Sequence, residues 1–153
     1  MSNIHYSTSI KMQKLPAEQQ QQIIDAIKNA ELATSGEIRV HIEGVCPNGD
    51  PMARAVEVFE HLGMHKTREQ NGVLFYVAVD DRKFAVIGDK GIDQKVPAHF
   101  WEDIKDTLRQ QFALNQYAQG LSLGIARAGE QLQAYFPRPT NDTNELSDDI
   151  SYS

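Results

Sequence analysis

Hydrophobic and polar residues alternate strictly over residues 37–43. Ile38, Val40 and Ile42 fall on one face, and the polar residues between them fall on the other. Because successive side chains of a strand point to opposite faces, this pattern predicts a strand with one face in the core and one in water. A strand with a wet face is expected at or near the edge of a sheet.

A second strand is predicted at residues 73–79, where every residue is apolar. A strand that is apolar on both faces is typical of the centre of a sheet covered by helices on both sides. The polar turn Asp80-Asp81-Arg82 then leads into a further strand at residues 83–87. A connection this short permits only an antiparallel hairpin.

Four segments show the spacing of amphipathic helices: residues 16–33, 51–62, 97–112 and 116–135. Pro51 suits a first helical position, and Asp50 before it supplies a carboxylate N-cap. The last helix contains Gly120, Gly124 and Gly129, each of which costs about 1 kcal/mol relative to alanine. Glycines in such a position predict the close approach of another backbone.

The order strand, helix, strand over residues 37–79 predicts a βαβ unit with parallel strands, since such crossovers are right-handed in about 98% of cases. With the hairpin added, the fold class is α/β. We expect a small mixed β-sheet sandwiched between helices, Rossmann-like with three layers. One domain is expected at residues 10–138, with a flexible N-terminus at 1–9 and an acidic, mobile tail at 139–153.

Charge and composition exclude several classes of function. The 153 residues include 15 Lys and Arg against 21 Asp and Glu, a formal charge of −6, which argues against binding nucleic acid or anionic lipid. No apolar run is long enough to cross a bilayer, and the N-terminus lacks the pattern of a signal peptide, so we expect a cytoplasmic protein without membrane insertion. Cys46 is the only cysteine, which excludes an intramolecular disulfide.

The acidic residues point to a cation. The carboxyl ends of the two parallel strands should lie at one end of the sheet and bring together Glu43, Asp50, Asp80 and Asp81. A hard cation relieves the repulsion between carboxylates, and oxygen ligands suit calcium, the favoured ion, or magnesium. A purely structural interpretation stays open, because aspartate is common in turns and Asp50 is already accounted for as an N-cap.

A second loop, residues 88–91 with the sequence Gly-Asp-Lys-Gly, is expected near Glu37 at the opposite end of the sheet. Glycine-rich loops can bind anions through main-chain N–H groups. No phosphate-loop motif follows, which favours a tight turn.

Several ordered fragments resemble the TPM domain family over about residues 16–137. They are Glu31-x-x-Thr34-x-Gly36-Glu37-Ile38-x-Val40, Asn71-Gly72-Val73-Leu74, Asp81-Arg82, Ile87-Gly88-x-x-Gly91-Ile92 and Gly120-Leu121…Gly124-Ile125…Gly129…Leu132…Phe136-Pro137. The resemblance implies an α/β sandwich that binds divalent cations, calcium among them. A plant thylakoid member is associated with acid phosphatase activity and photosystem repair.

The resemblance also bears on individual residues. Asp81 and Arg82 match the Asp-Arg turn of the family and are the candidate catalytic residues. Asn115-Gln116-Tyr117 stands where many relatives have Gly-Asp before the last helix, which removes a carboxylate.

Three functions follow as hypotheses. The first is a domain that binds a divalent cation without turnover. The second is a metal-dependent acid phosphatase of low activity, in which Arg82 neutralises phosphate and Asp81 holds metal or positions water. The third is a non-catalytic module for interaction with another protein.

Overall fold

A four-stranded mixed sheet organises the fold, which the computed structural model describes for residues 15–138 and 150–152. The strands are β1 (Glu37–Glu43), β2 (Gly72–Ala78), β3 (Lys83–Gly88) and β4 (Ser151–Tyr152), in the order β3-β2-β1-β4. β1 and β2 are parallel, whereas β2 and β3 form an antiparallel hairpin. The predicted βαβ unit and hairpin are therefore confirmed.

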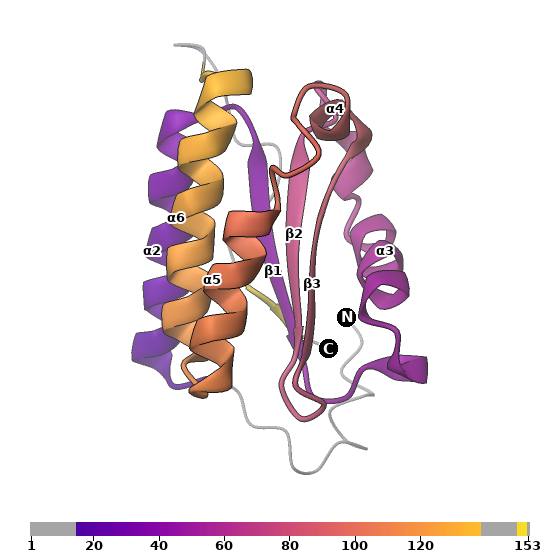
Figure 1. The fold of residues 1–153 in the computed structure, drawn as a ribbon, viewed down its shortest axis with the longest axis vertical. Coiled ribbons are helices and arrows are strands. Elements are labelled where there is room, and N and C mark those ends of the chain that lie inside the picture. The colour runs from indigo at the N-terminus through magenta and orange to yellow at the C-terminus, as the bar shows by residue number, and fades with distance from the viewer. Residues whose placement is uncertain (1–14, 139–149, 153) are drawn as a thin grey trace.

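Helices cover both faces of the sheet, as Figure 1 shows. α2 (Ala17–Ala33), α5 (Glu102–Ala113) and α6 (Tyr117–Tyr135) lie on one face, and α3 (Pro51–His61) lies on the other. Short helical turns α4 (Lys90–Asp93), η1 (Pro47–Gly49) and η2 (Met64–Lys66) occupy the connections. The predicted three-layer α/β architecture is confirmed.

The sheet separates two hydrophobic clusters. Ile38, Val40 and Ile42 face the larger cluster beneath α2, α5 and α6. Leu74 and Tyr76 of β2 face the smaller cluster beneath α3. All residues of β2 are buried, as expected for a strand with helices on both sides.

The glycines of α6 allow the helices to approach closely. A Cβ atom added at Gly129 would lie 2.7 Å from the Cβ of Ala30 in α2, and one at Gly120 would lie 2.8 Å from the Phe112 ring. Both distances are shorter than van der Waals contact. At Gly129, the predicted approach of another backbone is confirmed, because the Ala30 Cα would lie only 2.9 Å away.

α5 begins at Glu102, later than the predicted start at Pro97. Two turns precede it, in which the Phe100 N–H donates to the Pro97 carbonyl and the Glu102 N–H donates to the His99 carbonyl, each at 3.0 Å. These bonds span three residues and turn the chain more tightly than an α-helix does. Phe100 still packs in the larger cluster, as its place in the pattern indicates.

The polar face of β1 is not wet, so that prediction was wrong. Glu37, His41 and Glu43 are all buried. α3 covers this side of the sheet, and β4 pairs with β1 opposite His41 and Ile42. Glu43 bonds to Arg54 of α3, and the His41 ring lies at hydrogen-bond distance from Ser151 of β4, which accounts for the burial of these two polar side chains.

The predicted flexible segment at 1–9 lies outside the described residues, as do 139–149 and 153 of the predicted mobile tail. Residues 151–152 form β4, which the sequence pattern did not predict. Within the described part of the chain, no helix is long and apolar enough to cross a membrane.

Candidate functional site

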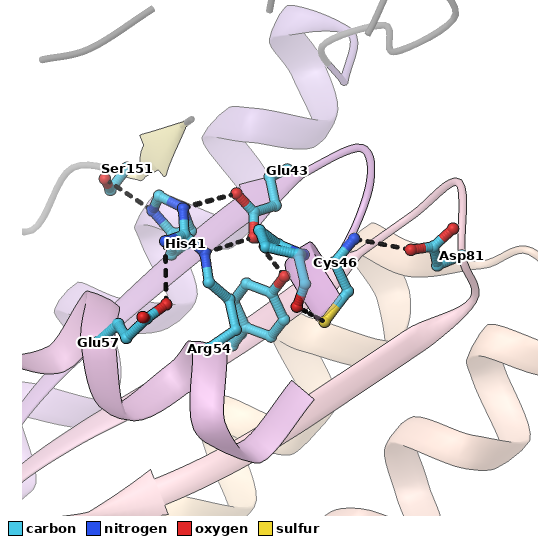
Figure 2. A network of polar contacts seen from close by, with 9 residues as sticks. His41, Glu43, Cys46, Arg54, Glu57, Asp81 and Ser151 are labelled. Carbon is cyan, nitrogen blue, oxygen red and sulfur yellow. Dashed lines mark hydrogen bonds and ion pairs between the residues drawn. The ribbon is translucent and has the colours of Figure 1, made fainter. Parts of the chain in front are cut away.

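The carboxyl end of β1 carries a buried ion pair. The guanidinium of Arg54, on the first turn of α3, binds the Glu43 carboxylate through Nε to Oε2 and Nη2 to Oε1, both at 2.9 Å. Figure 2 shows this pair with its neighbours. Two parallel hydrogen bonds between charged groups fix the geometry as well as the charge, and they anchor α3 to the sheet.

Two residues of the sheet complete the network around Glu43. The Tyr76 hydroxyl donates to Glu43 Oε2, and His41 Nε2 lies 3.9 Å from Glu43 Oε1. His41 and Tyr76 are direct partners in the β1–β2 register, and their rings stack with centroids 6.1 Å apart. The parallel pairing thus places an imidazole and a phenol side by side beneath α3.

The network controls protonation. Burial raises the Glu43 pKa, but contacts with His41, Arg54 and Tyr76 outweigh that effect and lower it from 4.5 to about 2. Burial also raises the pKa of Tyr76, as does its bond to the Glu43 carboxylate. At neutral pH the site therefore contains a carboxylate, a guanidinium and a neutral phenol.

His41 connects this network to the far end of the chain. Its Nδ1 lies 3.0 Å from the Ser151 hydroxyl of β4, at hydrogen-bond distance. Burial lowers the pKa of His41 below 6.5, although the charge of Glu43 acts in the opposite direction. The imidazole is consequently neutral at pH 7.

The Asp80-Asp81-Arg82 turn lies against the loop after β1. Asp81 Oδ2 accepts a hydrogen bond of 2.7 Å from the Cys46 N–H, and the Asp80 N–H donates to the Gly44 carbonyl at 2.8 Å. Figure 2 shows the Asp81–Cys46 contact beside the Glu43 network. The turn and the 44–50 loop are therefore held together as one unit.

Each predicted cation ligand lies at this end of the sheet, but the side chains have different partners. Glu43 is held in its ion pair, and Asp50 caps α3 by accepting from the Ala53 N–H at 3.1 Å. Asp81 is bonded to the loop, and Asp80 is exposed. Within residues 15–138 and 150–152, no group of three or more His, Cys, Asp or Glu side chains is arranged to hold a metal.

The candidate catalytic residues Asp81 and Arg82 are neighbours in the turn. Arg82 is exposed and has a φ of 55°, a left-handed conformation that is uncommon outside glycine. The thiol of Cys46 is buried, with Sγ 3.9 Å from the Pro47 carbonyl oxygen, which fits an ordinary structural cysteine.

The second candidate loop forms a tight turn at the opposite end. Asp89 accepts from the Lys90 N–H at 2.8 Å and so begins α4. A Cβ atom at Gly91 would lie 2.2 Å from the Glu69 carbonyl oxygen, so only glycine fits. This packing accounts for the glycine without a bound anion.

Sequence reasoning missed Arg54, His41 and Tyr76 as partners of Glu43. Tyr76 belongs to the apolar run at 73–79 and is buried as that pattern predicts, but its hydroxyl has a polar role as well. The available signal was the polar face of residues 37–43, since a buried carboxylate requires a cationic partner on the covering helix.

Comparison with known proteins decides the family. A family model described as the TPM domain matches residues 11–131. The chain belongs to the TPM domain family. None of the curated proteins matches the chain.

Solved structures resemble this TPM domain along most of their length. The BA42 protein of the psychrophilic bacterium Bizionia argentinensis is 44% identical, with a TM-score of 0.88 over 94% of this chain and 98% of that one. The N-terminal domain of a protein from P. gingivalis is 18% identical, with a TM-score of 0.66 over 88% of this chain and 90% of that chain. The N-terminal domain of cg2496 from Corynebacterium glutamicum is 11% identical, with a TM-score of 0.63 over 90% and 80%. The last two show a shared fold.

Proposed function

We propose that this TPM domain binds a divalent cation, calcium in preference to magnesium, at the Asp80-Asp81-Arg82 turn. The observation that carries the proposal is the pair of consecutive carboxylates at the carboxyl end of the parallel strands, held against the 44–50 loop through the Asp81–Cys46 bond. Carboxylate and main-chain carbonyl oxygens are the ligands that calcium prefers.

The donor set is narrower than the sequence predicts. Glu43 does not fit as a ligand, because a cation would compete with the two hydrogen bonds from Arg54. Asp50 caps α3 through Oδ1, just as Asp81 accepts from the Cys46 N–H through Oδ2, so Asp50 stays in the donor set through its second oxygen. Asp80 and Asp81 fit, since both side chains are at least partly open to solvent and offer hard oxygen atoms. They would hold the ion together with carbonyl oxygens of the adjoining loop.

The test compares thermal unfolding with and without millimolar calcium or magnesium. A ligand present at 100 times its Kd stabilises the native state by about 2.7 kcal/mol, which raises Tm by several degrees in a domain of this size. Asp80→Asn and Asp81→Asn should abolish the increase. Asp25→Asn, the same change on the exposed surface of α2, should retain it.

The increase caused by calcium is measured for each variant against its own ion-free Tm, because Asp81→Asn also alters the bond to Cys46. An absence of any shift in the wild type would refute the proposal, as would equal shifts in wild type and Asp80→Asn. The phosphatase alternative stays a prediction, and no contact in the described residues favours it.

A further inference from the structure

β3 is an edge strand whose outer side is unpaired within the described residues. The Asp89 N–H donates to the Gly72 carbonyl directly opposite it, at 2.9 Å. Hydrogen-bonded and non-hydrogen-bonded pairs alternate along an antiparallel ladder. Phe84 and Val86 therefore direct their main-chain N–H and C=O groups away from β2, where another strand could bond to them.

A basic groove runs over this edge. A cavity of about 330 Å³ extends from the start of α3, across residues 82–86, to α5. Arg82, Lys83, Lys105 and Arg109 line it. No acidic side chain of the described residues lines it, but Asp106, outside the groove, pairs with Arg109 at 2.7 Å. The whole protein has 21 acidic and 15 basic residues, so the charge of the groove is opposite in sign to the net charge of the protein.

An aromatic cavity of about 200 Å³ adjoins the basic groove and shares Arg82, Lys83 and Arg109 with it. Its apolar wall includes Phe84, Phe112 and Tyr117. The Phe84 and Phe112 rings meet edge to face with centroids 5.4 Å apart, and Phe112 and Tyr117 are 4.9 Å apart. Mutual packing of the rings holds this wall in shape.

We propose that the β3 edge binds an extended acidic segment of a partner protein, which adds to the sheet as a further strand. Main-chain bonds to Phe84 and Val86 would supply affinity, as in other cases of strand addition. Carboxylates of the segment would face the four basic side chains, and one apolar side chain would enter the aromatic cavity. This inference is independent of the proposed cation site.

Charge argues against a second copy of the chain as the occupant. Pairing of β3 with β3 about a two-fold axis would bring the same four basic side chains against one another. Lysines on edge strands prevent this kind of self-association. The positive charge that repels a second copy attracts an acidic strand, which makes the groove selective.

The experiment measures fluorescence anisotropy with a short labelled peptide in which glutamates alternate with valines. A chelator is present, so that the result does not depend on cation binding. We expect Lys105→Glu combined with Arg109→Glu to weaken binding about tenfold or more, because two favourable charge contacts become repulsive. Lys28→Glu combined with Arg127→Glu changes the net charge equally on exposed surfaces of α2 and α6, and should leave binding intact.

A second peptide, N-methylated at every residue so that neither edge can donate a main-chain hydrogen bond, separates strand addition from simple charge attraction. The N-methylated peptide should bind about tenfold more weakly than the unmodified peptide. In NMR spectra of the protein, the unmodified peptide should shift the amide resonances of Phe84 and Val86. Equal binding of both peptides, or no binding at millimolar concentration, would overturn the proposal. Self-association of the protein alone through β3, seen by sedimentation, would overturn it in favour of a second copy.

Discussion

Replacement of Arg54 by methionine is expected to destabilise the protein strongly. The Glu43 side chain is 3% exposed and that of Arg54 is 17% exposed, so the substitution leaves a buried carboxylate without its cation. Removal of one partner from a buried pair costs about 3–5 kcal/mol. Methionine retains much of the volume of the arginine stem, so little of this cost arises from lost packing.

The pKa of Glu43 gives an independent magnitude. It falls from 4.5 to about 2 in the folded protein. A difference of about 2.5 in pKa corresponds to about 3 kcal/mol of stabilisation of the ionised form. This total includes the contributions of His41 and Tyr76 as well as Arg54, and it lies at the lower end of the cost expected for Arg54→Met.

The contribution of Glu43 to the free energy of unfolding should change with pH in opposite directions in the wild type and in Arg54→Met. In the wild type the folded pKa of Glu43 is depressed, so its contribution is complete above pH 4.5 and is lost as pH falls from 4.5 towards 2. In Arg54→Met, burial of the unpaired carboxylate favours protonation and raises its pKa. The difference in stability between the two proteins should therefore shrink as pH falls from 7 to 4.

Urea unfolding at pH 7 and pH 4 measures both effects. Arg109→Met is the matched control, because its pair with Asp106 is 56% and 60% exposed and should contribute less than about 1 kcal/mol. Glu43→Gln combined with Arg54→Met should recover part of the stability by removing the buried charge. A loss below about 1 kcal/mol in Arg54→Met, or a difference that grows in acid, would refute the reasoning.

Three further outcomes are expected. Tyr76→Phe removes the hydroxyl that donates to buried Glu43 and should lower the free energy of unfolding in urea by about 1–3 kcal/mol. An unchanged urea midpoint would show that this hydrogen bond does not stabilise the fold. Gly129→Ala should cost about 1–3 kcal/mol despite its better helix propensity, because the new methyl group meets Ala30, and a higher Tm would show that the helices can separate at little cost. The pKa of His41 is below 6.5 in the folded protein, so the unfolded chain binds a proton more readily and the free energy of unfolding should fall as pH drops below 6.5. His41→Gln should flatten this dependence. An unaltered profile from pH 7.5 to 5.5 would show that other groups cause the dependence.

The sheet was predictable because its strands differ in pattern. The apolar run at 73–79 indicated a central strand, and the three-residue turn at 80–82 left only an antiparallel partner, both as observed. β4 was not predictable in this way. Two residues carry no periodicity, and Ser151 and Tyr152 pair with β1 through tertiary contacts more than 100 residues away in sequence.

The sequence predicted where the candidate site lies, but not which side chains contact one another there. The βαβ rule put Glu43, Asp50 and Asp81 at one end of the sheet, where they are found. It could not show that Arg54 turns inward, because arginine at that position of an amphipathic helix is equally typical of a solvated surface. Only the packing of α3 on the sheet brings its guanidinium to Glu43.

The unequal layers of the fold have a consequence for its motions. Apart from the short turn η2, which contributes Met64, α3 alone among the described helices covers its face of the sheet, over the smaller hydrophobic cluster, whereas α2, α5 and α6 share the larger one. Segments with less buried apolar contact open at lower free energy in amide hydrogen exchange. α3 should therefore detach from the sheet before the rest of the protein unfolds. Each such opening would carry Arg54 away from Glu43 and admit water to the carboxylate.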